Sequence, residues 1–201
     1  MPLPVNLAVF ISGGGSNLQS LIDAAKAGRL SARIVLVVSS RADAFGLERA
    51  RREKIDTVVY KTKDYPSPED AEKDLLKILE YYRVELIALA GYLKMIPVSV
   101  IKKYKGRITN IHPALLPKYG GKGMYGHYVH EAVIASKDKE SGATVHLVDE
   151  IYDHGEILMQ ERVPVTPGDT PESLAERVLN VEHKIYPIAL EQLIRGKFGD
   201  G

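Results

Sequence analysis

The 201-residue chain contains no cysteine and no tryptophan, and it has no excess of charge of either sign. The absence of cysteine excludes disulfide bonds, thiolate metal sites and a cysteine nucleophile, although it does not indicate a compartment. Lysine and arginine total 27 against 26 for aspartate and glutamate, so the formal net charge is +1. Because no dense basic stripe accompanies this balance, we expect no nucleic-acid partner.

Long apolar runs and a secretion signal are also missing. No apolar stretch approaches the ~20 residues of a membrane-spanning helix. The N-terminal residues Met1-Pro2-Leu3-Pro4 lack the basic region, apolar run and small-residue cleavage site of a signal peptide. We therefore expect a cytoplasmic protein with no membrane partner.

The composition is ordinary for one globular unit, with 45% apolar and 26% charged residues. A chain of this length is sufficient for one sizeable core and tight for two. No low-complexity linker and no internal repeat is visible. We therefore expect a single domain over residues 1–201.

Strand-like and helix-like spacing of apolar residues alternate over residues 1–110. Strands are predicted at residues 6–11, 32–38, 57–60, 86–90 and 107–111. Helices are predicted at residues 17–27, 44–53, 68–82 and 98–104. This alternation is typical of an α/β, Rossmann-like, doubly wound and mostly parallel sheet flanked by helices, with right-handed connections.

The pattern changes in the second half of the chain. Residues 144–148 and 157–163 are predicted strands joined by a polar, turn-rich link. The run Asp169-Thr170-Pro171-Glu172 is a helix start signal, and the helix that follows extends to about residue 196, with a kink expected at Pro187. The expected fold thus ends in a mixed C-terminal strand pair and a long C-terminal helix.

Three consecutive glycines follow the first predicted strand, in the run Ser12-Gly13-Gly14-Gly15-Ser16-Asn17. They let the backbone turn tightly and approach a ligand, and the free N–H groups at the next helix start suit a phosphate. The run is neither a Walker A loop, since no lysine follows, nor a dinucleotide fingerprint, since Leu18 replaces its last glycine. A phosphate on a mononucleotide-like substrate fits better; the alternative is a tight turn without a ligand.

Asn110 and His112 lie at the end of the fifth predicted strand. Ligands of open α/β sheets bind at the carboxyl ends of strands, and residues two apart in a strand point to one face. An amide donor and an imidazole could hold a developing oxyanion and move a proton near neutral pH. The alternative is an asparagine that bonds the backbone beside a partly buried histidine.

Asp153 and two further histidines complete the set of candidates. A carboxylate near His112 would raise the pKa of the imidazole and fix its orientation, but spacing does not show this pairing, and a solvated acidic loop is the alternative. His127 and His130 could share a helix face and bind a metal. No nearby run supplies further ligands, so we expect no metal.

These segments resemble the glycinamide ribonucleotide formyltransferases, a folate-dependent family of purine synthesis, over nearly the whole chain. The resemblance is carried by ISGGGSNLQSLI (residues 11–22), ADAFGLERAR (42–51), LAGYLKMI (89–96), NIHPALLPKY (110–119), SGATVHLVDEIYDHGEILMQ (141–160) and VEHKIYP (181–187). NIHP followed by LLP belongs to the wider formyltransferase superfamily. The glycine loop with SNLQ, together with EHxIYP, points to this family.

The resemblance implies that a formyl group passes from 10-formyltetrahydrofolate to the amine of glycinamide ribonucleotide, by direct amine attack and without a metal. It implies a catalytic set of Asn110, His112 and Asp153. It implies a phosphate site formed by Gly15, Ser16 and Asn17. Glu182 would contact the substrate's amino end or ribose hydroxyls. It implies a folate pocket lined by Leu93, Lys94, Met95, Ile96, Val148, Asp149 and Glu150. Residues 1–110 would bind the phosphorylated substrate and residues 111–201 would complete the folate pocket, in a monomer or homodimer.

Two segments depart from shorter members of the family. After Tyr119 the chain reads GGKGMYGHYVHEAV, a few residues longer, and residues 120–126 are expected to form a mobile flap over the folate. The arginine that some members place early in the third helix to meet the folate tail has no obvious counterpart, since Pro68 lies there. The contacts of the folate tail are therefore left open.

Three other functions are alternatives to formyl transfer onto this amine. A formyltetrahydrofolate hydrolase carries an extra N-terminal domain, for which we expect no room before the strand at residue 6. A methionyl-tRNA formyltransferase carries an added C-terminal nucleic-acid-binding domain, which we do not expect after the last helix of a chain with balanced charge. A non-catalytic phosphosugar-binding module would need no cluster of Asn110, His112 and Asp153, and turnover assays would separate it from an enzyme.

Overall fold

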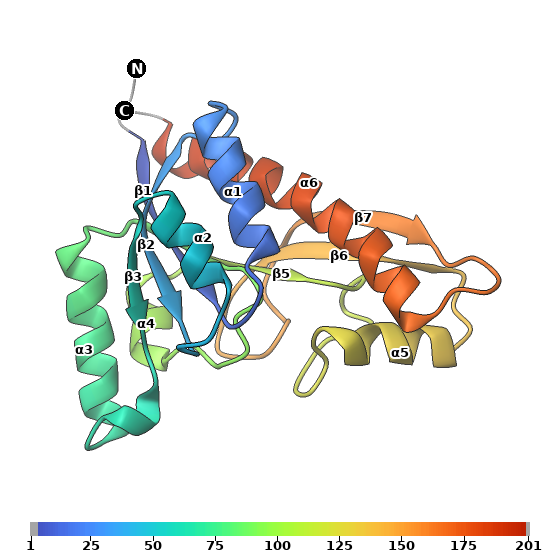
Figure 1. The fold of residues 1–201 in the computed structure, drawn as a ribbon, viewed down its shortest axis with the longest axis horizontal. Coiled ribbons are helices and arrows are strands. Elements are labelled where there is room, and N and C mark those ends of the chain that lie inside the picture. The colour runs from blue at the N-terminus through green and yellow to red at the C-terminus, as the bar shows by residue number, and fades with distance from the viewer. Residues whose placement is uncertain (1–3, 200–201) are drawn as a thin grey trace.

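A seven-stranded sheet forms the centre of the computed structural model, which describes residues 4–199 (Figure 1). Its strands are β1 (Val5–Ile11), β2 (Ala32–Ser39), β3 (Asp56–Val59), β4 (Leu86–Leu89), β5 (Ile108–His112), β6 (Glu140–Leu147) and β7 (Ile157–Pro164). They lie in the order β3-β2-β1-β4-β5-β6-β7. The first five pair in parallel, whereas β6 pairs antiparallel with both β5 and β7. The predicted mostly parallel sheet with a mixed C-terminal strand pair is confirmed.

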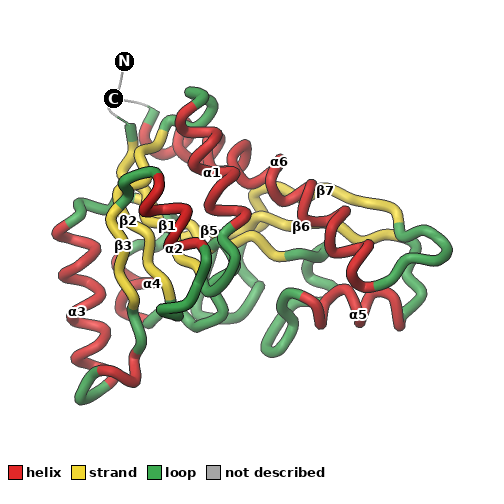
Figure 2. The backbone as a smooth tube through the Cα atoms, in the orientation of Figure 1, coloured by secondary structure: helices red, strands yellow, loops and turns green. Residues whose placement is uncertain are grey.

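The helices connect these strands and flank the sheet (Figure 2). They are α1 (Ser16–Lys26), α2 (Gly46–Arg52), α3 (Pro68–Tyr81), α4 (Val98–Lys103), α5 (His127–Ala135) and α6 (Pro171–Phe198), with a short 3-10 turn at Thr62–Asp64. The predicted helices are present with ends shifted by a few residues. Two elements differ from prediction: β6 begins at Glu140 rather than at residue 144, and α5 was not predicted as an element.

The sheet is covered on both faces because its strands alternate between two cores. In β1, Leu7, Val9 and Ile11 pack with α1, α2 and α6, whereas Ala8 and Phe10 pack with α3 and α4. All five side chains are fully buried. A continuous apolar run is the expected sequence of such a strand, since neither face meets water.

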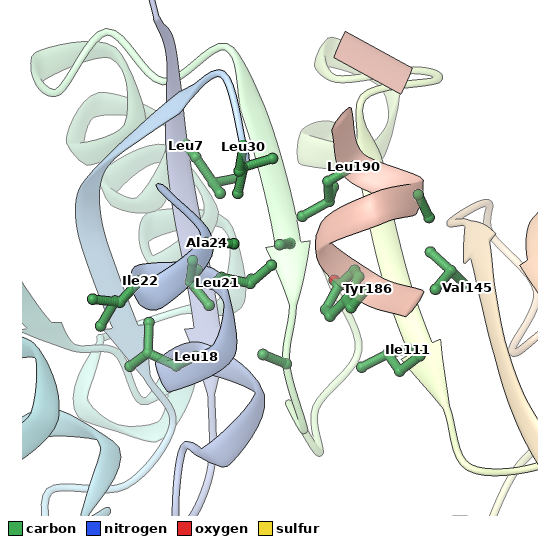
Figure 3. Close-up of a cluster of buried hydrophobic side chains, with 14 of the residues drawn as sticks. Leu7, Leu18, Leu21, Ile22, Ala24, Leu30, Ile111, Val145, Tyr186 and Leu190 are labelled. Atoms are coloured by element: carbon green, nitrogen blue, oxygen red, sulfur yellow. The ribbon is translucent and has the colours of Figure 1, made fainter. Parts of the chain in front are cut away.

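The long helix α6 crosses the sheet and joins the two halves of the chain. Thr170 and Ser173 form the capping box that starts it, as predicted from the sequence. The helix continues through Pro187, where a kink was expected, and it remains one helix from Pro171 to Phe198. Tyr186 and Leu190 lie in the core beside Ile111 and Val145 (Figure 3).

The ends of three parallel strands are tied together where the chain turns toward the site. The Ser12 hydroxyl, just after β1, lies 2.7 Å from the Ser40 hydroxyl just after β2. It also accepts a hydrogen bond from the backbone N–H of Leu93, beyond β4, at 2.9 Å. These bonds hold the loops at the carboxyl edge of the sheet in one arrangement. Within residues 4–199, none of the helices combines the length and hydrophobicity needed to cross a bilayer.

Candidate active site

A cleft of about 690 Å³ opens at the carboxyl edge of the sheet. Its size is within the range of small-molecule sites, which hold roughly 300–1,000 Å³. The predicted site residues that line it are Asn17, Leu93, Lys94, Met95, Ile96, Asn110, His112, Val148, Asp149, Asp153 and Glu182. Gly15 and Ser16 directly precede Asn17 but are not among the lining residues. Glu150 is exposed and does not line the cleft, although its neighbours Asp149 and Ile151 do.

Asn110 and His112 reach this cleft because β5 alternates its side chains. Both line the cleft, as the spacing of two predicts. The intervening Ile111 and the preceding Thr109 face the other way, toward Tyr186 of α6. The strand therefore presents its polar pair to the cleft, whereas Thr109 and Ile111 are buried on the α6 side, with Ile111 also bordering the cleft.

Asp153 lies in the loop between β6 and β7, with a left-handed backbone at φ 52°. One carboxylate oxygen, Oδ1, has three nitrogen atoms around it: His112 Nδ1 and His146 Nε2 at 3.6 Å, and Asn110 Nδ2 at 3.5 Å. The other, Oδ2, accepts the backbone N–H of Gly121 at 2.9 Å. The fold thus brings together Asn110, His112 and Asp153, although 41 positions separate the last two.

His112 has an acceptor at each ring nitrogen. Its Nε2 donates to the carbonyl of Tyr119 at 2.8 Å, and its Nδ1 faces Asp153. Burial lowers the pKa of His112 below its usual value, against the opposing influence of Asp153 and the Tyr119 carbonyl, which raise it. The expectation of a raised pKa is therefore wrong for the net shift, because the side chain is only 3% exposed, while the upward influence of Asp153 is as predicted.

The carboxylate of Asp153 is stabilised by its neighbours. Burial alone would raise the pKa of Asp153, but His146, His112 and the Gly121 N–H lower it, and the net pKa is below the usual value. Asp153 is consequently ionised at neutral pH. It is a negative charge held next to an imidazole whose pKa burial lowers.

His146 is a site residue that sequence reasoning missed. It lies opposite Asn110 in the antiparallel register of β5 and β6. Its Nδ1 donates to the carbonyl of Leu147 at 2.8 Å, so in the neutral ring Nε2 accepts from Asn110 Nδ2, 3.1 Å away, and only the protonated ring also donates toward Asp153. The imidazole thereby fixes how the Asn110 amide is turned. The sequence signal was only the strand pattern around Thr144, because the partner depends on the β5–β6 register.

The two histidines weighed as metal ligands, His127 and His130, divide between surface and cleft. His127 is exposed and its Nε2 lies 3.0 Å from Glu131 Oε1. His130 is 4% exposed, lines the cleft and has a buried Nδ1 without a partner. Burial lowers the pKa of His130 to about 4, with the charges of His127 and His112 adding to the effect. Across residues 4–199, no group of three or more histidine, aspartate or glutamate side chains is arranged to hold a metal.

The glycine loop leaves the start of α1 open. Gly15 is the N-cap at φ 71°, and no side chain hydrogen-bonds the first turn. A Cβ atom on Gly15 would lie 2.6 Å from the Cα of Gly46, so both the backbone conformation and the close packing require glycine. The backbone N–H groups of residues 15–18 have no acceptor within the helix, which is the arrangement that binds anions.

Asn17 and Glu182 join this loop to α6 at one end of the cleft. Asn17 Nδ2 donates to Glu182 Oε2 at 2.5 Å, while the buried Oδ1 of Asn17 has no partner. Burial raises the pKa of Glu182 to about 7, against the lowering influence of the Asn17 bond. The pair offers acceptor oxygens to a ligand that carries N–H or O–H donors.

Comparison with known proteins places these features in one family. A family model described as formyl transferase matches residues 5–190. The chloroplastic phosphoribosylglycinamide formyltransferase of Arabidopsis thaliana is 47% identical over 186 residues, covering 92% of this chain and 64% of the relative. The Escherichia coli phosphoribosylglycinamide formyltransferase is 37% identical over 193 residues, covering 96% of this chain and 89% of the relative.

Solved structures agree with the sequence comparison. The crystal structure of glycinamide ribonucleotide transformylase 1 from Symbiobacterium toebii superposes with a TM-score of 0.91 at 38% identity, covering 98% of this chain and 91% of that chain. The chain spans less than two thirds of the length of the plant relatives, at 64% and 60%. The bacterial relatives are closer to it in length.

Proposed function

This chain belongs to the formyl transferase family, and on that premise we propose that it transfers a formyl group from 10-formyltetrahydrofolate to the amine of glycinamide ribonucleotide in purine synthesis. One observation carries the proposal. A single cleft contains the Asn17–Glu182 pair at one end and the cluster of Asn110, His112 and Asp153 beside it. The relatives named above bear the name of this reaction.

The amine substrate would enter from the glycine loop. Its phosphate would accept the N–H groups of Gly15, Ser16 and Asn17, because these donors are free and lie at the positive end of α1. Glu182 and the unpartnered Oδ1 of Asn17 would accept hydrogen bonds from the amino end or the ribose hydroxyls. The amine would then lie toward Asn110 and His112.

The formyl donor would occupy the apolar part of the cleft. Leu93 and Met95 are 52% and 51% exposed, although both line the cleft together with buried Ile96. Large apolar side chains left open on a concave surface suit a flat aromatic ligand such as a pterin. Val148 and Asp149 line the cleft from the loop that also carries Asp153.

Attack of the amine on the formyl carbon places negative charge on the former carbonyl oxygen. The Asn110 amide would donate to this oxyanion, an interaction worth roughly 3–4 kcal/mol in other enzymes. His146 holds one N–H of the amide at 3.1 Å before the substrate arrives, and the second N–H, which faces Asp153 Oδ1 at the longer distance of 3.5 Å, would turn to the oxyanion. The oxyanion donor therefore needs little rearrangement as the charge develops.

The proton released by the attacking amine must reach the leaving nitrogen of the folate. Because burial lowers the pKa of His112 and so favours the neutral imidazole, we assign it the role of acceptor for this proton, directly or through water. Asp153 then stabilises the imidazolium. When the bond between the formyl carbon and the folate nitrogen breaks, His112 returns the proton to that nitrogen. The scheme uses no metal and no covalent enzyme intermediate.

The organisation and setting of the protein complete the proposal. Residues 1–201 would act as one domain in the cytoplasm, as a monomer or homodimer. Its partners would be the two small molecules, without nucleic acid or membrane. The plant relatives are named as chloroplastic, so family membership does not determine the compartment, and the cytoplasmic location is part of our proposal.

A two-substrate assay tests the proposed reaction. Purified protein is mixed with 10-formyltetrahydrofolate, with and without glycinamide ribonucleotide, and release of tetrahydrofolate is followed by absorbance. We expect release that depends on the amine and a formylated amine of equal amount. Release without the amine would indicate a hydrolase instead, and absence of release in both mixtures would contradict an enzyme that uses this donor.

A further inference from the structure

The conspicuous ADAFGLERAR run, residues 42–51, has no part in the reaction described above, yet it forms the helix that contacts the glycine loop. The backbone N–H of Gly46 donates to the carbonyl of Gly13 at 3.0 Å. Arg49 Nε donates to the carbonyl of Gly14 at 2.9 Å. Residues three apart lie on the same face of a helix, so one face of α2 holds two successive carbonyls of the loop.

These two bonds determine where the loop N–H groups point. In a trans peptide the carbonyl and the following N–H point in opposite directions. A Gly14 carbonyl that is turned to Arg49 therefore directs the N–H of Gly15 away from α2. The contact is close, because a Cβ atom on Gly46 would lie 2.5 Å from Ile11 Cδ1 and 3.2 Å from the Cα of Gly15.

Arg49 is also unusual in its charge environment. Its other contacts are neutral: Nη1 donates to Gln19 Oε1 at 3.3 Å, and the guanidinium lies 5.2 Å from the centre of the Phe45 ring. The neighbouring Arg51 pairs with Glu48. No acidic side chain within residues 4–199 forms an ion pair with Arg49. Its positive charge is thus available next to a loop whose N–H groups are free.

The charge of Arg49 extends to the α6 side of the site. His183, next to Glu182, has a buried Nε2 without a partner. Burial lowers the pKa of His183, and the charge of Arg49 adds to that effect. The field of the guanidinium therefore reaches α6, and an anion bound on the glycine loop would meet the same field.

We propose that Arg49 is a positioning residue of a phosphate-monoester site on the glycine loop: its bond to the Gly14 carbonyl directs the Gly15 N–H to the phosphate, and its unneutralised charge raises phosphate affinity. The inference rests on the proposed function, because it takes the substrate phosphate as the occupant of the loop. It adds to that function a residue of α2 and a reason for the glycine at position 46.

Binding of ribose 5-phosphate, measured by titration calorimetry, tests this role without turnover. The variants are Arg49→Met, which keeps the stem, and Arg49→Lys, which keeps the charge. The control is Arg52→Met, because Arg52 lies on the same helix and contacts the same ring, 5.7 Å from its centre. We expect Arg49→Met to raise Kd by at least about tenfold, as for loss of a hydrogen bond and charge at an anion. Arg49→Lys should recover part of the loss, and Arg52→Met should bind as the wild type does.

Kinetics separate this role from general damage to the protein. With the phosphorylated amine, Arg49→Met should raise KM and leave kcat nearly unchanged. With the unphosphorylated riboside, it should behave as the wild type. Equal losses on both substrates, or wild-type binding of ribose 5-phosphate by Arg49→Met, would overturn the inference.

These experiments distinguish failure of the proposed phosphate site from failure of the proposed reaction. Arg49-dependent binding of ribose 5-phosphate in a protein without formyl transfer would support the phosphate site and reject the reaction. Formyl transfer in a wild-type protein that binds no ribose 5-phosphate would reject the inference and keep the reaction.

Discussion

The environment of His112 is produced by two residues with unfavourable backbone conformations. Tyr119, whose carbonyl accepts from Nε2, has φ 58°, and Asp153, which faces Nδ1, has φ 52°. Left-handed backbone is uncommon outside glycine and costs of order 1–3 kcal/mol where the surroundings impose it. Both strained residues contact the same imidazole, which is consistent with a site whose geometry is held at some cost in stability.

Asp153→Asn is expected to weaken catalysis through His112. Because the Asp153 charge raises the His112 pKa against burial, its removal should lower that pKa further. The imidazolium formed during proton transfer would also lose its counter-charge, so kcat should fall on the order of 10²–10⁴-fold. An NMR titration of His112 beside steady-state kinetics measures both effects.

Asn110→Ala is the matched comparison for that variant. It should lower kcat by roughly 10²–10³-fold through loss of the oxyanion donor, while the His112 titration changes little. If Asp153→Asn instead keeps both the titration and the rate of the wild type, Asp153 and His112 are not coupled. Asp153 would then be an ordinary loop acid.

Glu182→Gln is expected to change how stability depends on pH. The pKa of Glu182 is about 7 in the folded protein and ordinary in the unfolded chain, so the folded state binds more protons between about pH 4.5 and 7. Its contribution to stability is therefore fully present at low pH and is lost as pH rises through 7. Thermal melts should show the variant gaining Tm relative to the wild type between pH 5 and pH 8.

Glu176→Gln provides the control for Glu182, since it is an exposed residue of the same helix and the same cleft. Its Tm difference from the wild type should be the same at both pH values. A parallel pH dependence for Glu182→Gln and the wild type would contradict the raised pKa. Weaker substrate binding by Glu182→Gln alone would in addition support its proposed contact to the amine substrate.

At the scale of elements, the flap predicted for residues 120–126 is anchored at its beginning. The Gly121 N–H donates to Asp153, and a Cβ atom on Gly120 would lie 3.2 Å from the Asp153 Cβ. Beyond this point Gly123 and Gly126 adopt positive φ, and Tyr125 is exposed at 46%. We therefore narrow the predicted mobile part to residues 122–126.

Amide exchange should show this division. In the free protein residues 122–126 should exchange fast, and a bound folate analogue should slow them, because glycine-rich backbone is costly to order without a ligand. Gly121 should already be slow, and Asp153→Ala, which removes the acceptor of its N–H, should make it fast. Slow exchange of residues 122–126 with and without the analogue would contradict a flap.

Elements were predictable where the sequence carries a local signal. Ser67 caps α3 and Thr170 caps α6, and both starts were readable from the cap residue followed by proline. The start of β6 was not readable, because Glu140 pairs only through its register with Pro164 of β7. The helix α5 was missed because it follows a glycine-rich segment and its N-cap, Gly126, makes no side-chain cap bond.

The site follows the same division between local and non-local information. The shared face of Asn110 and His112 follows from the period of a strand. The approach of Asp153 to them was implied by family resemblance and not by spacing. His146 depends on the β5–β6 register, and the His112 pKa depends on burial that no local pattern reveals.

At the scale of the whole molecule, residues from both sides of position 110 meet in one cleft. Asn17, near the N-terminus, bonds Glu182, which belongs to the last helix. The cleft is likewise lined from both sides of residue 110, by Tyr92 and Tyr152 among others. The end proposed to bind the phosphorylated substrate thus includes a residue of α6, so we expect the two halves to depend on each other for function.

A stability measurement on a Tyr186 variant tests whether the two halves of the chain unfold together. Its side chain is fully buried in α6, and its hydroxyl donates to the carbonyl of Leu89 at 3.0 Å and contacts the Thr109 carbonyl at 3.3 Å. Tyr186→Phe keeps the ring and removes the hydrogen bonds of the hydroxyl, at a cost of about 0.5–1.5 kcal/mol. For a chain of this size each kcal/mol lowers Tm by roughly 2–4 °C.

Calorimetry should show one transition in both proteins, at lower Tm in the variant, because loss of α6 packing opens the cores on both sides of residue 110. Tyr81→Phe, at an exposed tyrosine, should leave Tm unchanged. Two separate transitions, with only one of them shifted by Tyr186→Phe, would contradict the single domain.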